Sequence, residues 1–372
     1  MPVDSSAREL VFVAHSGRAS GAEKIMLTLA ERAVAKGWRV RVVCPDGPLR
    51  KLLPATVGHV AIPELGLAGQ RGGQRLRAAA VMLWRWALAA RVLRRVARTA
   101  GVRLVVNSTM ALPAVALALP PRRSAVWLVH DVVAGRRQHT VARVGRRAVG
   151  RAVAVSERAA APVRALGFEV EVARQGVRWP VEAAPVVERS PLVVGILGVV
   201  TEWKGQHVLL AAAAGLPEVV IEIAGSPHPG DEPYLAALRE RARRPDLAGR
   251  VRFLGNVDPL PTIRGWDVLV SASVLPEAGP LVVLEAMSVG VPVVATGHGG
   301  NVTDDTAVCV APDDPVALRE ALRRLGREPD LRARLRDSGR AAVAARHDLA
   351  ETLPRMLDVL LGTPDQIEEV GP

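Results

Sequence analysis

Short apolar runs, each bounded by glycine, proline or small polar residues, recur along the chain and alternate with segments of helical periodicity. Runs of this kind predict buried strands, and their alternation with helices predicts parallel sheets joined by right-handed crossovers. We therefore expect an α/β fold. The predicted strands cover residues 10–14, 40–44, 104–108, 126–131 and 152–157 in the first half, and 192–198, 219–225, 251–255, 266–271 and 291–296 in the second.

Helical periodicity predicts a first crossover helix over residues 24–36, ending at Gly37, and three tail helices over 317–325, 331–345 and 349–361. A chain of 372 residues is long enough for two domains. The aperiodic, proline-containing stretch at residues 179–185 is typical of a linker. The predicted parts are domains 1–178 and 191–347, a linker at 179–190, a C-terminal helix at 348–362 and a frayed tail at 363–372.

The formal net charge of +12 is unevenly distributed along the chain. Residues 1–178 carry 30 Lys and Arg against 10 Asp and Glu, residues 179–372 carry 19 against 27, and no acidic residue occurs from Leu65 to His130. Such a field attracts anionic lipid head groups, acidic polymers or nucleic acid. The chain has no nucleic-acid reader motif and few Tyr or Phe to stack on bases, so we do not expect nucleic acid as a partner.

The segment 75–98 is predicted to be a long basic amphipathic helix, too short and too charged at Arg85 to span a membrane. At 100° per residue its arginines share one arc of about 100° and its apolar residues share the neighbouring arc. Either the helix packs on the core with a solvated arginine face, or it docks on an anionic membrane with Trp84 and Trp86 at the interface. The arginines are Arg77, Arg91, Arg94, Arg95 and Arg98; the apolar residues are Val81, Leu88, Ala89, Val92 and Val96.

Two cysteines, Cys44 and Cys309, each end a strand-like run and are far apart in the sequence, which favours separate buried thiols over a disulfide or a metal site. The N-terminus shows no basic-then-apolar signal segment, and no apolar run reaches about 18 residues. We therefore expect a cytoplasmic protein.

The stretch Pro276–Met287 carries the candidate chemistry, because it predicts a helix between two strands with Pro280 in its first turn and Gly290 at its end. Glu277 would lie on the entry loop and Glu285 about two turns later, both near the helix N-terminus, where backbone N–H groups and the helix dipole attract anions. A phosphate ligand flanked by hydroxyls fits this arrangement. Acidic residues are also common at helix starts for structural reasons alone.

The surrounding motifs decide between these readings. The Glu277-x7-Glu285 spacing with its trailing Glu-Ala-Met, and the strand 290–296 followed by Gly299-Gly300, resemble the retaining nucleotide-sugar glycosyltransferases of family 4. Trp203-Lys204-Gly205-Gln206 after a strand ending in glycine resembles the donor-diphosphate loop of that family. The resemblance covers residues 10–360 and implies the GT-B fold, in which two Rossmann-like domains with parallel sheets face each other across a cleft, and the last helix crosses back to the first domain.

The resemblance also implies roles for individual residues. Glu277 contacts the donor sugar, Glu285 holds the ribose, and Lys204 neutralises charge on the leaving diphosphate. The amides of Leu281 and Val282 would bind phosphate, and His130, at the C-terminal end of the predicted strand 126–131, matches the cleft histidine. The catalytic candidates are Glu277, Lys204 and His130, and the donor-binding candidates are Gly21, Gly198, Lys204, Gly225, Gly255, Glu277, Gly279, Leu281, Val282 and Glu285.

Two departures from the family pattern stand out: Val199 replaces an arginine that is common after the strand glycine, and Pro280 replaces a common glycine. The expected activity is retaining transfer of a hexosyl group from a UDP- or GDP-sugar to an acceptor alcohol in a lipid-linked or cell-envelope saccharide, at the inner face of an anionic membrane. No Asp-x-Asp motif accompanies the diphosphate loop, so we expect no metal and no cofactor besides the donor. The alternatives are a soluble secondary-metabolite acceptor or a sugar-nucleotide epimerase of the same fold.

Overall fold

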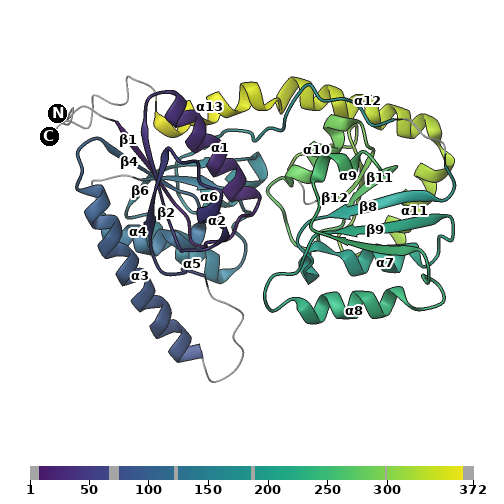
Figure 1. Cartoon of the computed structure of the whole chain (residues 1–372), viewed down its shortest axis with the longest axis horizontal. Coiled ribbons are helices and arrows are strands. Elements are labelled where there is room, and N and C mark those ends of the chain that lie inside the picture. Colours follow the sequence, from purple (N-terminus) through teal and green to yellow (C-terminus); the bar gives the residue numbers. More distant parts are fainter. Residues whose placement is uncertain (1–7, 67–74, 121–124, 186–188, 298–299, 363–372) are drawn as a thin grey trace. The chain divides into compact units, whose positions relative to one another are not determined.

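The computed structural model describes residues 8–66, 75–120, 125–185, 189–297 and 300–362, which form two α/β units (Figure 1). The first unit comprises the chain up to Gln175 together with the C-terminal segment from Thr352 onward, and the second unit comprises Gly176–Glu351. Chain segments that the sequence analysis assigned to a linker at 179–185 and 189–190 thus belong to the second unit. The predicted frayed tail at 363–372 lies outside the described residues.

The first unit contains a seven-stranded parallel sheet with strand order β3-β2-β1-β4-β5-β6-β7. The order reverses between β1 and β4, which is the topological switch point where open α/β sheets bind ligands beyond their carboxyl ends. Its strands are β1 Glu9–Val13, β2 Arg39–Cys44, β3 Val57–Ala61, β4 Val102–Val106, β5 Ala125–Val129, β6 Val149–Ala154 and β7 Val170–Val172. Its helices are α1 Gly21–Ala35, α2 Pro48–Lys51, α3 Arg75–Ala97, α4 Leu112–Ala118, α5 Arg136–Gly145 and α6 Glu157–Ala165, with a 3-10 turn η1 at Thr109–Ala111.

The second unit repeats the design with a six-stranded parallel sheet of order β10-β9-β8-β11-β12-β13 and a switch point between β8 and β11. Its strands are β8 Leu192–Leu197, β9 Val219–Ala224, β10 Val251–Gly255, β11 Val268–Ser271, β12 Val293–Thr296 and β13 Val308–Val310. Its helices are η2 Glu202–Lys204, α7 Gln206–Ala213, α8 Glu232–Ala242, α9 Pro259–Ile263, α10 Leu281–Val289, α11 Pro315–Arg327 and α12 Pro329–Arg346. The predicted α/β class and parallel sheets are confirmed.

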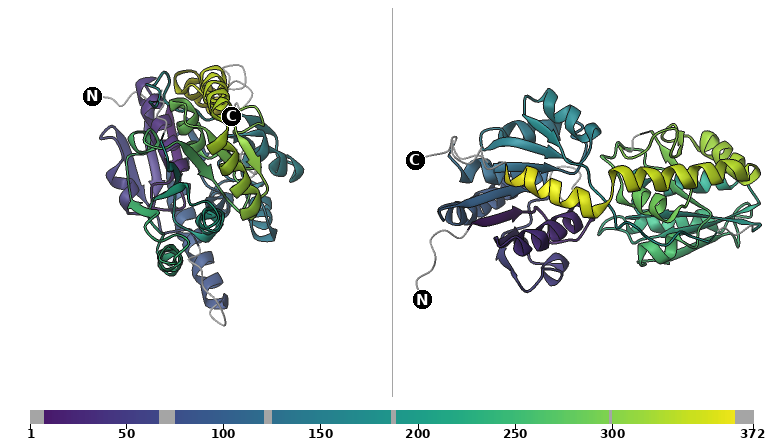
Figure 2. Two further views of the ribbon diagram at one scale, coloured as in Figure 1. Left: turned by 90° about the vertical axis from the view of Figure 1, so that its right-hand side faces the viewer. Right: turned by 90° about the horizontal axis from the view of Figure 1, so that it is seen from above.

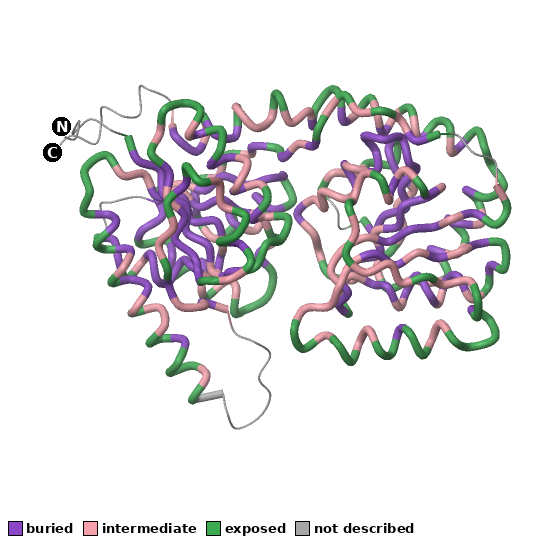
Figure 3. Tube along the Cα trace, viewed as in Figure 1, coloured by how far each residue is buried: buried purple, intermediate pink, exposed green. Residues whose placement is uncertain are grey.

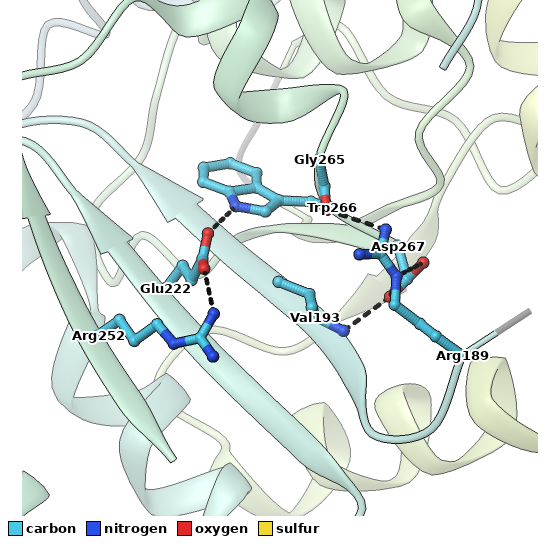
Figure 4. A network of polar contacts seen from close by, with 7 residues as sticks. All are labelled: Arg189, Val193, Glu222, Arg252, Gly265, Trp266 and Asp267. Atoms are coloured by element: carbon cyan, nitrogen blue, oxygen red, sulfur yellow. Dashed lines mark hydrogen bonds and ion pairs between the residues drawn. The ribbon is translucent and has the colours of Figure 1, made fainter. Parts of the chain in front are cut away.

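The central strands of both sheets are buried (Figure 3), and the helices range from α10, which is buried on most sides, to α8, in which only Leu238 is buried. In the second unit, Trp266 lies across Gly195 of β8, where an added Cβ would come within 1.9 Å of the indole ring. The indole N–H donates to Glu222 over 2.8 Å, and Asp267 accepts from the Val193 N–H over 2.7 Å (Figure 4). A glycine in mid-strand is thus explained by the aromatic side chain packed on it.

The last helix, α13 (Leu349–Leu361), packs with the first unit from Thr352 onward. Met356, Leu357, Leu360 and Leu361 are buried. Lys36 of α1 pairs with Asp358, and Arg103 of β4 donates to the carbonyl oxygen of Leu361. Figure 2 shows this helix, in yellow, alongside the first unit. Among the described residues, no helix is long and apolar enough to cross a bilayer.

Several local predictions needed correction. Helix α1 begins at Gly21, three residues before the predicted start, because the Glu23 carboxylate accepts the Ser20 N–H over 3.1 Å and closes an earlier cap. Helix α10 begins at Leu281, so Pro280 is its N-cap with ψ of 127° and does not lie in the first turn. Three observed strands, each at the edge of its sheet, are not in the predicted set: β3 and β7 have mixed polarity, and β13 has three residues.

Helix α3 is formed as predicted to within one residue, but its buried face differs from the predicted arc. The side chains of Met82, Ala89, Leu93 and Val96 are buried, whereas Val81, placed in the apolar arc, is exposed. The reason is length: the helix extends beyond the sheet at its N-terminal end (Figures 1 and 2). Both cysteines are free thiols, as predicted; Cys44 is buried and Cys309 is half-buried.

Candidate active site

Three of the predicted donor-site glycines meet at the carboxyl edge of the second sheet, although they come from three strands. Gly198, Gly225 and Gly255 follow or end β8, β9 and β10, which are neighbours in the sheet. The Gly225 N–H donates to the Gly255 carbonyl over 2.7 Å, and a Cβ on Gly225 would lie 1.8 Å from the Gly198 carbonyl oxygen. This edge is therefore bare backbone that a ligand can approach closely. The Lys204 side chain passes 3.8 Å from the position of a Gly198 Cβ.

The loop after β8 holds Lys204 in one place. Lys204 is the last residue of η2, and Gly205 follows it with φ of 73°. A Cβ on Gly205 would lie 2.0 Å from the carbonyl oxygen of Ala272, which follows β11. The Lys204 ammonium pairs with Glu277 over 2.6 Å and lies 4.4 Å from the centroid of the Trp203 ring. The side chain is only 18% exposed. The carboxylate and the aromatic face thus hold this cation in a partly desolvated site, beside the glycine edge of the sheet.

Glu277 accepts hydrogen bonds from two side chains. The Lys204 ammonium is one donor, and the Ser273 hydroxyl is the other. The Thr296 hydroxyl donates to the Ser273 carbonyl oxygen over 2.9 Å, which ties the loop after β11 to the end of β12. The two catalytic candidates of the second unit, Lys204 and Glu277, are thus in direct contact although they lie 73 residues apart in the sequence.

Gly279 lies two residues beyond Glu277, with φ of 153°, and is packed against Asn301. A Cβ on Gly279 would lie 2.6 Å from Asn301 Oδ1 and 2.8 Å from Nδ2. Nδ2 is buried and has no hydrogen-bond partner among the described residues. Asn301 was missed by the sequence analysis, because a single asparagine after a Gly-Gly pair gives no signal until the fold places it here. Gly299, part of the motif, lies outside the described residues.

The N-terminus of α10 follows directly. The Val283 N–H donates to the Pro280 carbonyl over 3.2 Å, and the preceding N–H groups of Leu281 and Val282 have no acceptor within the helix. Glu285 is half-buried in the second turn of α10. The roles predicted for Leu281, Val282 and Glu285 stay predictions.

His130 and Gly21, the remaining candidates, lie in the first unit and are linked by a residue that the sequence analysis did not assign. His130 follows β5, and its Nε2 lies 2.8 Å from Oδ1 of Asn107, which follows β4 and is 2% exposed. Asn107 Nδ2 faces the Ala22 carbonyl at 3.5 Å, beside Gly21 at the start of α1. Since that carbonyl orients the amide, we infer that Nε2 of His130 carries the proton and Nδ1 is an acceptor.

Burial lowers the pKa of His130 to about 4, so the imidazole is neutral at physiological pH. A neutral histidine can accept a proton or a hydrogen bond through Nδ1 but adds no positive charge. Among the described residues, no group of three or more His, Cys, Asp or Glu side chains is placed to hold a metal ion.

Sequence comparison identifies the origin of these motifs. Residues 19–178 match the family described as Glycosyltransferase Family 4, and residues 190–328 match the one described as Glycosyl transferases group 1. The chain belongs to the family 4-like glycosyltransferases. It is similar to the D-inositol 3-phosphate glycosyltransferase of Corynebacterium urealyticum, with 30% identity over 222 residues. That match covers 55% of this chain and 52% of the relative, so it spans about half of the relative's length.

Solved structures confirm the fold of this family 4-like chain. Anabaena Alr3699/HepE, solved in complex with UDP and glucose, superposes with a TM-score of 0.77 at 21% identity, covering 95% of this chain and 99% of that one. Sucrose-phosphate synthase from Thermosynechococcus elongatus gives a TM-score of 0.78 at 18% identity, covering 98% and 100%. The predicted GT-B fold is confirmed.

Proposed function

We propose that the protein is a retaining glycosyltransferase that moves a hexosyl group from a nucleoside-diphosphate sugar to an acceptor alcohol. The observation that carries this proposal is the contact between Lys204 and Glu277 beside the bare glycine edge of the second sheet. In a family 4-like site these residues meet the donor diphosphate and the donor sugar. The Anabaena structure with UDP and glucose supports a nucleotide sugar as the donor.

In the proposed reaction, the bond between the sugar anomeric carbon and the diphosphate oxygen breaks while the acceptor oxygen bonds to the same face of that carbon. The acceptor proton passes to the departing phosphate oxygen, so no enzyme carboxylate needs to act as nucleophile. Lys204 and the N–H groups of Leu281 and Val282 stabilise the charge that develops on the diphosphate. Negative charge on the diphosphate grows as the bond breaks, so these contacts are stronger in the transition state than in the bound donor, and the difference raises turnover.

Lys204 must change partners for this to happen. Glu277 neutralises it in the free protein, and an incoming diphosphate would compete for the ammonium. Ser273 still donates to the Glu277 carboxylate, so the carboxylate keeps one donor and is free to accept from a sugar hydroxyl. The pair therefore links donor binding to the orientation of the sugar.

The acceptor would bind the first unit, near His130 and Gly21, and we propose a lipid-linked or cell-envelope saccharide. The support for this acceptor is the charge distribution, because residues 1–178 have a net positive charge whereas residues 179–372 have a net negative charge. An uncharged soluble acceptor gives no reason for such a field, whereas an anionic membrane surface does. The proposed location is accordingly the cytoplasm, at the inner face of the membrane. We expect no metal or added cofactor.

The test is transfer of labelled hexose from a panel of UDP- and GDP-sugars into a lipid extract. Thermal shift first selects the donor, because a ligand at about 100 times its Kd raises stability by about 2.7 kcal/mol. The expected result is labelled lipid with wild type, and little with Lys204→Ala despite an intact fold. A donor that binds but yields only an isomerised sugar nucleotide, without any acceptor, would favour an epimerase. Label in soluble hydroxylated metabolites alone would favour a secondary-metabolite acceptor.

A further inference from the structure

The exposed face of α3 changes along its length from a mainly apolar part, in which Arg77 is the one charged residue, to a basic part. Of residues 77–84, which we call the α3 tip, only Met82 is buried. Val81, Leu83 and Trp84 are 45%, 60% and 61% exposed. Figure 3 shows the same change from buried to exposed along the helix.

Arginines continue the exposed face beyond the tip. Arg91 and Arg95 follow Trp84 by seven and eleven residues, so all three lie within about 20° of one line along the helix. Arg98, just past the helix end, is also exposed. None of α3, α4 and α5 contains an Asp or Glu. The face thus consists of a mainly apolar tip that includes Arg77, followed by a row of arginines, with no acidic residue on these three helices.

Neighbouring elements extend this surface. Arg94 Nη2 donates to the Leu117 carbonyl of α4 over 2.7 Å, and Leu117 is 52% exposed. Of the eight exposed large apolar side chains among the described residues, five lie on α3, α4 and α5: Val81, Leu83, Trp84, Leu117 and Val144. Trp86, expected at an interface, instead turns inward, because its indole N–H donates to the Met110 carbonyl over 3.2 Å.

We propose that this face docks on an anionic bilayer, with the α3 tip inserted at the head-group boundary and Arg91, Arg95 and Arg98 on lipid phosphates. Charge complementarity favours a membrane as the partner. The apolar side chains of the tip could bind any hydrophobic surface, but the row of arginines is attracted specifically to a surface of lipid phosphates. The inference deepens the proposed function by naming the surface that meets a membrane acceptor. Lipid binding itself needs no donor, so it can be measured separately from transfer.

The experiment is sedimentation of the full chain with vesicles of neutral or of 30% anionic lipid. The expected results are binding to anionic vesicles only, release by salt as the Debye length falls to about 10 Å at 0.1 M, and weakening by about 100-fold in Arg91→Gln/Arg95→Gln/Arg98→Gln. Arg94 is left in place because it holds Leu117. The matched control is Arg244→Gln/Arg327→Gln/Arg334→Gln, three exposed arginines of the second unit, which should bind like wild type.

The tip is tested separately with Leu83→Ser/Trp84→Ser, and Val316→Ser serves as a control because it removes a 67% exposed side chain from the second unit. Of these two variants, only the tip variant should lose vesicle binding, and brominated lipid should quench wild-type fluorescence more than that of Trp84→Phe.

Equal binding to neutral and anionic vesicles, or arginine variants that bind like wild type, would overturn the proposal. So would a concentration-dependent dimer that the tip variant abolishes, since the tip would then be a contact between copies. Donor binding, measured by thermal shift, should be unchanged in every variant, and its loss in wild type would count against the proposed function alone.

A second inference comes independently from the buried amide in the second unit. Asn301 lies against Gly279, two residues from Glu277, with an N–H group that is buried and has no described partner. A buried donor left without an acceptor costs about 1–3 kcal/mol, so an acceptor supplied by a ligand would bind there favourably. We infer that Asn301 donates to a hydroxyl of the donor sugar and thereby helps select the sugar. This inference rests on the proposed function.

Calorimetry with the nucleoside diphosphate and with its sugar conjugate tests it. Asn301→Ala should lower the affinity for the sugar conjugate about tenfold and change the affinity for the nucleoside diphosphate by no more than about twofold. The unfolding temperature of the variant checks that its fold is intact. Equal loss for both ligands would mean that Asn301 only supports the loop, and no loss would also refute the role. A wild-type protein that binds neither ligand would instead refute the proposed function.

Discussion

At the scale of the residue, Glu277 and Glu285 offer a separation of roles. Glu277→Gln keeps the shape but removes the charge that faces Lys204, so turnover and sugar discrimination should fall about 100-fold while nucleotide affinity changes little. Glu285→Gln should mainly weaken nucleotide binding. Steady-state kinetics and diphosphate titration measure both. Identical nucleotide affinity in the two variants would show that the roles are not divided in this way.

Val199 tests the main departure from the family pattern. Its carbonyl oxygen accepts from Gln206 Nε2 over 3.0 Å, so replacing the side chain leaves that backbone contact in place. Val199→Arg should tighten the nucleoside diphosphate by about tenfold at low salt, because a charged hydrogen bond contributes about 1.5–3 kcal/mol. Val199→Gln is the uncharged control. Unchanged or weaker binding by the arginine variant would mean that another cation already serves the diphosphate.

His130 predicts a pH dependence of stability. Its pKa is lowered to about 4 in the folded state, from about 6.5 when unfolded, so the unfolded chain binds the proton first. The stability that His130 contributes is therefore present above pH 6.5 and is lost as pH falls toward 4, by about 3 kcal/mol in total. Urea unfolding of wild type and His130→Gln should show a stability difference that shifts against wild type over this range. A difference independent of pH would contradict an imidazole that is neutral in the folded protein.

At the scale of the element, β8 depends on the fit between Gly195 and Trp266. Gly195→Ala should destabilise the second unit by about 2–4 kcal/mol, because the new methyl would overlap a ring held by its hydrogen bond to Glu222. Gly326→Ala is the matched control: it lies in α11 with its nearest neighbour 3.5 Å from the added Cβ, so it should be neutral or stabilise by up to about 1 kcal/mol. Equal effects in urea unfolding would contradict this account of β8.

At the scale of the whole molecule, α13 ties the end of the chain to its first unit. Arg103 and Arg151, from β4 and β6, donate to the carbonyl oxygens of Leu361 and Leu360. A chain ending at Asp348 should therefore show faster hydrogen exchange in β4 and β6 and unchanged exchange in β8 and β9. A chain ending at Gly362 is the control and should match wild type. Faster exchange in β8 and β9 alone would show that α13 supports the second unit instead.

The α/β class and most strands could be predicted from the amino-acid sequence, because fully buried parallel strands are short apolar runs that can be identified without knowledge of their neighbours. It also indicated Lys204, Glu277 and the glycines, because their spacing along the chain is part of a family motif. It could not show β3, β7 or β13, which are short or of mixed polarity and become strands only by pairing at a sheet edge.

Which side chains are in contact became known from the three-dimensional fold. The pairing of Lys204 with Glu277, of His130 with Asn107, and of Gly279 with Asn301 each joins the ends of different strands. The same holds for α3. Helical periodicity placed Val81 in the apolar arc, but Val81 is exposed because the helix extends beyond the sheet at its N-terminal end. Burial and contact depend on what lies opposite in space, and periodicity along one segment carries no information about that.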